Sequence, residues 1–191
     1  MGGAAQSVSP SAAVSAAAEL SPEALALLGA DTAPSSFIAL LSEKKLFPDA
    51  VRFLAHALPK REAVWWAWVC AKRVAGDAPE PKTKVSLDAT EKWIAQPSED
   101  NRRAAHLAAE QAGFGSAAGC AGLAAFFSGG SLAPPEAPPV PPGEFLTAKA
   151  VAGAIIFAAL GKEPEKGTEK FQSFIAQGVD VTTRIKLWEK K

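Results

Sequence analysis

The residues of this chain that could take part in acid–base or metal chemistry are few. Two histidines and two cysteines occur among 191 residues, and tyrosine is absent. His106 and Glu110 are four residues apart, so on a helix they would share one face, as metal-binding pairs do. No third ligand lies nearby, and the same spacing is typical of an ordinary surface pair. The sequence therefore predicts no metal site.

Cys70 and Cys120 are the candidates for a nucleophile, and either would need one of the two histidines as its base. Both lie in apolar helical runs, and nothing in the sequence brings a histidine close to them. Buried free thiols in a reducing cytoplasm are the simpler interpretation. Gly113-x-Gly115 follows a predicted helix, whereas a dinucleotide-binding loop follows a strand. We therefore predict no catalytic residue, no cofactor and no enzyme activity.

Three tryptophans form the most prominent aromatic cluster. Trp65, Trp66 and Trp68 lie within a run that is apolar on every face of a helix. At 3.6 residues per turn, Trp65 and Trp68 point about 60° apart, and Trp66 points about 100° away from Trp65. One face can then fill the core while the other lines a binding groove. Core packing of the whole cluster is the alternative.

Residues 129–144 contain six prolines. Their spacing includes Pro135-x-x-Pro138, Pro138-x-x-Pro141 and Pro139-x-x-Pro142, which matches polyproline ligands. Because the segment joins two apolar helices that both need burial, we predict an extended strap that packs across the domain, against Trp65 or Trp66. The residues predicted to bind a partner protein are Trp65, Trp66, Trp68, Pro138, Pro139 and Pro141.

The elements that position these residues are all predicted to be helices. Pairs such as Ser21-Pro22 begin helices, and residues such as Gly29 and Gly161 end them. No alternating apolar–polar segment indicates a strand. We predict an all-α domain of about eight to ten short helices, forming an irregular bundle or a short stack of helical hairpins. The expected helices cover about residues 22–28, 36–45, 48–58, 60–74, 88–96, 100–112, 115–127, 147–160, 165–177 and 179–188.

A weak internal similarity supports the stack as one alternative. Residues 49–55 resemble residues 88–95, and a proline and a longer Ala-rich helix follow each segment. The offset of about 39 residues suits a two-helix repeat.

The length and the net charge of the chain limit the number of domains and the classes of partner that we expect. A chain of 191 residues is typical of one domain. Its 20 basic and 20 acidic residues cancel, which argues against binding to nucleic acid or anionic lipid. Residues 1–19 are predicted to be a low-complexity Ala/Ser leader, mobile or weakly helical, before a single helical domain over residues 20–191. They lack the basic start of a secretory signal, so we expect a cytoplasmic protein.

Two apolar stretches, residues 113–128 and 148–160, support an alternative in which they insert into a membrane as a hairpin. Glycines interrupt the first stretch, and both apolar cores are shorter than the about 20 residues that span a bilayer. Two buried core helices are the preferred interpretation.

Four segments resemble an uncharacterised family of Ala-rich bacterial proteins, a domain of unknown function. They are residues 65–71, Phe114-Gly115, residues 126–135 and residues 147–154. The resemblance covers about residues 35–162, and Ser-Gly-Gly-Ser-Leu-Ala-Pro-Pro at residues 128–135 is its most specific part. It implies no activity, cofactor or catalytic residue. It implies an accessory role beside components of type VI secretion.

Together these observations favour a cytoplasmic, non-enzymatic adaptor or accessory protein that binds another protein, in a bacterial secretion machine. The membrane-inserting hairpin is one alternative. A small-molecule or metal enzyme that uses His106, Glu110 and a cysteine is another.

Overall fold

The computed structural model describes residues 10–189, and within them every regular element is a helix. The prediction of an all-α domain is therefore confirmed for the described part of the chain. The elements are α1 (Pro10–Ala18), α2 (Pro22–Leu25), α3 (Pro34–Glu43), α4 (Phe47–Ala57), α5 (Lys60–Ala75), α6 (Pro81–Ala95), α7 (Glu99–Ala112), α8 (Ala117–Phe126), α9 (Leu146–Leu160), a 3₁₀-helix (Pro164–Lys166) and α10 (Gly167–Arg184).

Local sequence signals explain where several helices begin and end. The side chains of Ser21, Ser98 and Ser116 each accept a backbone N–H of the first turn of α2, α7 and α8. Gly76 and Gly113 follow α5 and α7 with φ angles of 73° and 82°. These angles lie in a region that glycine adopts readily and that ends a helix.

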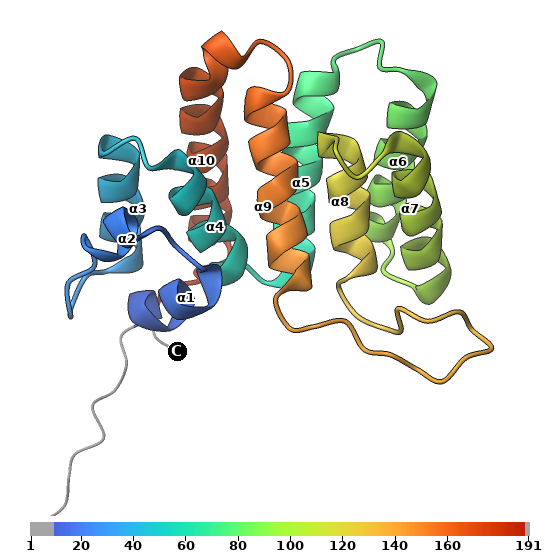
Figure 1. Cartoon of the computed structure of the whole chain (residues 1–191), viewed down its shortest axis with the longest axis horizontal. Coiled ribbons are helices and arrows are strands. Elements are labelled where there is room, and N and C mark those ends of the chain that lie inside the picture. Colours follow the sequence, from blue (N-terminus) through green and yellow to red (C-terminus); the bar gives the residue numbers. More distant parts are fainter. Residues whose placement is uncertain (1–9, 190–191) are drawn as a thin grey trace, which may run out of the picture.

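Helices α5, α8 and α9 form the centre of the bundle, and each packs against the other two. Figure 1 shows α6 and α7 beyond α8 on one side, and α10, α4 and α3 beyond α9 on the other. Helices α8 and α9 are antiparallel, so the long connection between them lies at one end of the bundle. That connection contains the prolines predicted to form a strap.

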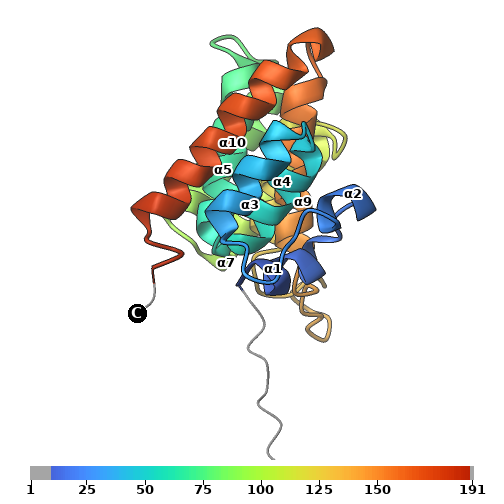
Figure 2. The same cartoon turned by 90° about the vertical axis from the view of Figure 1, so that its left-hand side faces the viewer.

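Helix α10, in front in Figure 2, packs on α4, α9 and α5. The largest fully buried apolar side chains of the core come from α3, α4, α5, α9 and α10, and burial of such side chains is the main driving force for folding. They include Phe37, Phe53, Trp66 and Phe174.

The arrangement is an irregular bundle and not a stack of equivalent hairpins. Helices α6 and α7 pack side by side, whereas α4 packs chiefly on α9, α1, α10 and α3. The similarity between residues 49–55 and 88–95 therefore marks no structural repeat. The reason is that α4 buries large residues on more than one face, with Phe47 and Val51 on one side and Phe53 on another, and needs partners on each side.

Three expected boundaries differ in the structure. Helix α6 begins at Pro81, although the sequence placed the start of this helix at Ser86 or Asp88. The predicted helices over residues 165–177 and 179–188 form one continuous helix, α10, with Gly178 inside it. Residues 10–18 of the predicted leader form α1, which packs on α4, and Ala18 is only 1% exposed. Residues 1–9 lie outside the described residues, and the domain boundary after residue 19 stays a prediction.

The two apolar stretches considered as a membrane hairpin, residues 113–128 and 148–160, contain α8 and α9. Among residues 10–189, no helix has both the length and the apolar character needed to cross a membrane.

Candidate functional site

Trp66 belongs to the core. Its side chain is 0% exposed, and its indole N–H donates to the backbone oxygen of Phe174 at 2.9 Å. A Cβ on Gly178 would lie 2.8 Å from the Trp66 ring, so a glycine is what lets α10 approach the indole this closely. The prediction that Trp66 contacts a partner is wrong, because a fully buried side chain presents no surface to another protein.

Trp65 and Trp68 are half-buried, on other faces of α5. The indole N–H of Trp68 donates to the Leu87 oxygen at 3.0 Å, and the ammonium of Lys72 lies 4.5 Å from the centre of a Trp68 ring. Trp65 lines a shallow hollow together with Arg61, Glu62 and Ile94. Helical geometry thus separates one core indole from two at the surface, as expected. A role of Trp65 and Trp68 in binding stays a prediction.

The proline-rich connection forms a closed loop, which we call the proline loop (residues 131–142). The backbone N–H of Leu132 donates to the oxygen of Val140 at 2.8 Å. The hydroxyl oxygen of Ser131 accepts the N–H groups of Ala133 and Val140 at 3.1 and 2.9 Å. These bonds join the two ends of the loop across its base, so the segment is not an extended strand of polyproline without internal hydrogen bonds.

Arg102 holds the base of the proline loop on the bundle. Its guanidinium donates to the oxygens of Phe126 at 2.6 Å and Ser131 at 2.8 Å, and makes two bonds of 2.7 Å to the carboxylate of Glu99. The Arg102 side chain is only 4% exposed. A bidentate pair of this kind fixes geometry as well as charge. Arg103 adds a bond to the oxygen of Ala133 at 3.0 Å.

Gly130 allows the chain to enter the loop beneath this guanidinium. Its φ angle is 65°, and a Cβ at this position would lie 2.8 Å from two nitrogens of Arg102. The angle and the close approach both favour glycine at this position.

The prolines of the loop project into solvent. Pro138, Pro139 and Pro141 are all exposed, and Figure 1 shows the loop extending away from the ends of α8 and α9. The predicted packing of this segment across the domain is wrong. Its carbonyls are satisfied at the loop base by Arg102 and Arg103, and Trp66 is sealed inside the core, so it offers no surface to the prolines. The prolines remain candidates for partner binding.

The sequence interpretation did not single out Arg102, although its side chain holds the base of the proline loop. A signal was present in Glu99, Arg102 and Arg103, whose spacings of three and four residues allow one carboxylate to pair with both arginines. What the spacing could not reveal is that the guanidinium of Arg102 also meets the connection after α8.

The histidine and the two cysteines considered for metal binding or catalysis each contact a different group. His106 stacks on Phe126, with ring centres 4.1 Å apart, and no cluster of three or more metal-ligating side chains occurs among the described residues. The Cys70 thiol donates to Gln177 and the Cys120 thiol to the oxygen of Phe114. Burial raises the pKa of both thiols, that of Cys120 to about 11, so neither is a thiolate at neutral pH.

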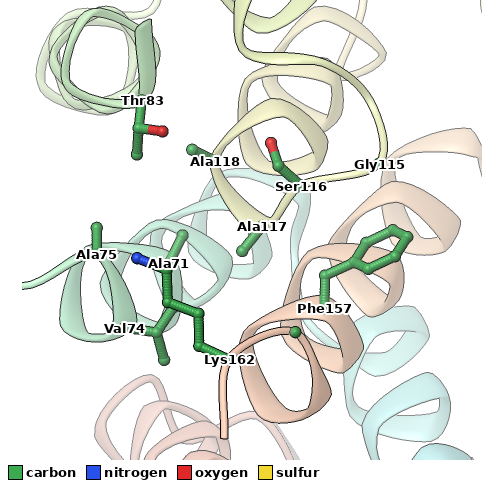
Figure 3. A pocket seen from close by; sticks show the side chains of 11 residues that line it. Ala71, Val74, Ala75, Thr83, Gly115, Ser116, Ala117, Ala118, Phe157 and Lys162 are labelled. Carbon is green, nitrogen blue, oxygen red and sulfur yellow. The ribbon is translucent and has the colours of Figure 1, made fainter. Parts of the chain in front are cut away.

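A cavity of about 200 Å³ opens where the ends of α5 and α9 meet the starts of α6 and α8. Figure 3 shows its lining of small side chains, with Phe157 on one side and Lys162 on another. The Ser116 hydroxyl in this lining already bonds to the oxygens of Ala112 and Gly113. None of the lining residues has a buried polar side-chain atom without a partner, so the cavity selects no particular ligand.

A second cavity, of about 190 Å³, lies between the end of α4, the start of α5 and the start of α9, and we call it the α4–α9 cavity. Two buried side-chain atoms of its lining, Nε2 of His56 and Oγ1 of Thr147, have no hydrogen-bond partner. Native proteins leave few such groups unpaired. The full lining is Ala55, His56, Leu58, Lys60, Ala63, Glu144, Phe145, Thr147 and Ala148.

The hydrogen bonding of His56 defines which ring nitrogen is free. Nδ1 lies 2.8 Å from the backbone oxygen of Arg52, and because a carbonyl only accepts, Nδ1 carries the proton. Burial lowers the pKa of His56, and nearby Lys149 lowers it further. The ring is therefore neutral at pH 7, and Nε2 presents a lone pair that can accept a hydrogen bond.

A comparison with protein families finds one relationship for this chain. A model described as a family of unknown function, DUF6931, matches residues 37–182. Neither the curated proteins nor the solved structures contain a significant match. The match includes the core indole, the arginines at the loop base and the proline loop itself.

Proposed function

Because the chain belongs to the DUF6931 family, whose function is unknown, we propose a function from its structure: it is a non-enzymatic protein-binding accessory protein that presents the proline loop to a partner. The observation that carries the proposal is the combination of exposed prolines with a base closed by Ser131 and held by Arg102.

A loop held in one conformation loses little entropy when a partner binds it. Ordering a flexible segment on binding costs conformational entropy and weakens the complex. A segment that is already ordered avoids most of this cost. Proline reduces this loss further, because its φ angle is already fixed. The exposed tip is largely apolar, with Val140 50% exposed beside the prolines and Glu136 as its one charged residue. The chemistry that fits this closed, largely apolar projection is an apolar groove lined by aromatic side chains on the partner.

Trp65 is the second residue that we assign to the interface. Its half-buried ring and shallow hollow offer apolar surface, and tryptophan is enriched among the residues that dominate binding energy. Trp68 is a weaker choice, since its N–H is already bonded. The Lys72 ammonium also lies closer to its ring, at 4.5 Å, than the Arg184 guanidinium does to the Trp65 ring, at 5.9 Å.

We extend the proposal to the setting of the interaction. The partner belongs to a bacterial secretion machine, of the type VI class, and the two proteins meet in the cytoplasm. This part rests on the sequence resemblance alone, and it is independent of the loop geometry.

The test is a quantitative pull-down from the native host with the full chain as bait. Replacing Pro138, Pro139 and Pro141 with alanine should reduce recovery of a specific protein at least about tenfold, which corresponds to about 1.4 kcal/mol of binding free energy. The matched control is Leu107→Ala, which removes a 60% exposed apolar side chain on α7 and should leave recovery unchanged. The recovered protein, once purified, should bind the wild-type chain directly.

The triple variant should remain folded, because its three prolines are exposed. Each loses only about 0.4–1 kcal/mol through the greater freedom of the unfolded chain. If the triple variant is folded and recovers the same proteins in the same amounts as wild type, the loop is not the binding element.

A further inference from the structure

We propose that the end of the bundle opposite the proline loop binds a free medium-chain carboxylate, an anion with one unbranched apolar tail. The site combines two cavities. One is the cavity of about 200 Å³ shown in Figure 3, which we call the apolar cavity. The other, of about 290 Å³, we call the basic cavity, and it is lined by Arg73, Val74, Lys162, Glu163, Lys166, Glu169, Lys170 and Phe174. The proposal does not depend on the proposed function.

The two cavities adjoin, because Val74 and Lys162 line both of them. Val74 belongs to the last turn of α5, and Lys162 follows the end of α9. A ligand that lies across this shared border can place its tail in the apolar cavity and its charge at the basic one. Together the two volumes fall within the roughly 300–1,000 Å³ of small-molecule sites.

The apolar cavity offers hydrophobic surface for a tail. Phe157 is 42% exposed on one side, and alanines of α5 and α8 line the others, as Figure 3 shows. The volume of about 200 Å³ equals that of about seven waters at roughly 30 Å³ each. A methylene group is of similar size, so a tail of about seven carbons fills the cavity. This lining alone sets no charge on the ligand.

Lys162 supplies a free positive charge at the shared border. Its ammonium makes no hydrogen bond or ion pair with any residue between 10 and 189. In Figure 3 its side chain reaches from the end of α9 toward Ala71 and Ala75 of α5. The residue is exposed, so an anion can approach it from solvent. A charge beside apolar walls gains more from a counter-ion than a charge surrounded by water does.

The basic cavity has four basic and two acidic side chains, a net charge of +2. Lys166 is paired with Glu163, and the Lys170 ammonium bonds to the backbone oxygens of residues 162 and 163. Arg73 uses one of its five N–H groups for a serine hydroxyl of α10 at 2.6 Å. Arg73 and Lys162 are therefore the cations left for a carboxylate. The two acidic side chains disfavour an anion with more than one charge.

Only a ligand with both a tail and a charge satisfies the two cavities. A neutral apolar molecule would leave the Lys162 ammonium unpaired, and an inorganic anion would leave the apolar cavity empty. A membrane phospholipid carries two tails, whereas the apolar cavity has room for one short tail. Octanoate, with seven carbons beyond its carboxyl carbon, is the expected best fit.

The test is isothermal titration calorimetry of the full chain with butanoate, hexanoate, octanoate and decanoate. Affinity should rise about fourfold for each added methylene up to octanoate, which corresponds to about 0.8 kcal/mol per group. It should then rise no further with decanoate, because the apolar cavity is full. Octan-1-ol has the same tail without the charge and should bind at least about tenfold more weakly, by about 1.4 kcal/mol.

Three variants assign the binding to this site. Lys162→Met keeps an apolar stem at an exposed position, so it should remain folded and bind octanoate at least about tenfold more weakly, by about 1.4 kcal/mol. Lys92→Met is the matched control, since Lys92 is an exposed lysine of α6 that lines neither cavity, and it should leave binding unchanged. Ala75→Leu fills part of the apolar cavity and should weaken octanoate more than butanoate.

Four outcomes would overturn the proposal. The first is the absence of saturable octanoate binding. The second is an affinity that does not change between butanoate and octanoate, which would indicate a plain anion site, or one that still rises with decanoate, which would indicate adsorption to the surface. The third is unchanged octanoate affinity in folded Lys162→Met. The fourth is displacement of octanoate by phosphatidylglycerol vesicles, which would make a membrane lipid the ligand.

Discussion

Replacing Trp66 with alanine should lower the free energy of unfolding by about 3–5 kcal/mol, the range measured for large aromatic side chains in protein cores. The indole is fully buried between α5 and α10, and its removal also leaves the Phe174 oxygen without its donor. Urea unfolding followed by circular dichroism measures the loss without relying on tryptophan fluorescence.

Trp65→Ala is the matched control for this prediction. It removes the same side chain one residue earlier, from a half-buried position, and should cost clearly less stability. Equal losses for the two variants, or a loss below about 1 kcal/mol for Trp66→Ala, would show that the indole is not the core residue described here.

Arg102→Met should destabilise the chain by about 2–4 kcal/mol, because it leaves the buried Phe126 oxygen and the part-buried Ser131 oxygen without their charged donor. The ion pair with Glu99 contributes little to this figure, since that carboxylate is 49% exposed and solvent can replace the arginine. The variant should also release the proline loop. Cleavage by a Glu-specific protease after the exposed Glu136 should then become faster than in wild type.

Arg103→Met provides the comparison on the same helix. Arg103 is 27% exposed and bonds to the same Glu99, so its loss should cost under about 1 kcal/mol and accelerate cleavage much less. If Arg102→Met unfolds at the wild-type urea concentration and is cleaved at the wild-type rate, Arg102 does not hold the loop.

The helices were predictable from sequence because their ends are encoded locally. Ser98 and Ser116 can cap a helix, and Gly113 can end one, without any knowledge of the tertiary fold. Where a boundary depends on a distant contact, prediction failed. Gly178 would be expected to interrupt a helix, but in α10 it faces Trp66, which is more than 100 residues away in the chain and needs the space.

The candidate sites also combine features that the local sequence predicts with features that depend on distant contacts. The apolar run around Trp66 predicted a core helix, and the proline spacing drew attention to residues 129–144. The clamp by Arg102 could not be predicted, because its acceptors Phe126 and Ser131 lie 24 and 29 residues further along the chain. The α4–α9 cavity likewise has both His56 and Thr147 in its lining, and these residues lie near each other only because α4 packs on α9.

The central claim is that the proline loop is a fixed projection, preorganised for a partner, and amide hydrogen exchange of the wild-type chain tests it most directly. The N–H groups of Leu132 and Val140 close the loop base, so both should exchange well below the rates of an unstructured peptide. Both should approach those rates in Arg102→Met. Exchange of Leu132 and Val140 at unstructured rates in the wild-type chain would contradict the claim, because the loop would then be a fluctuating linker.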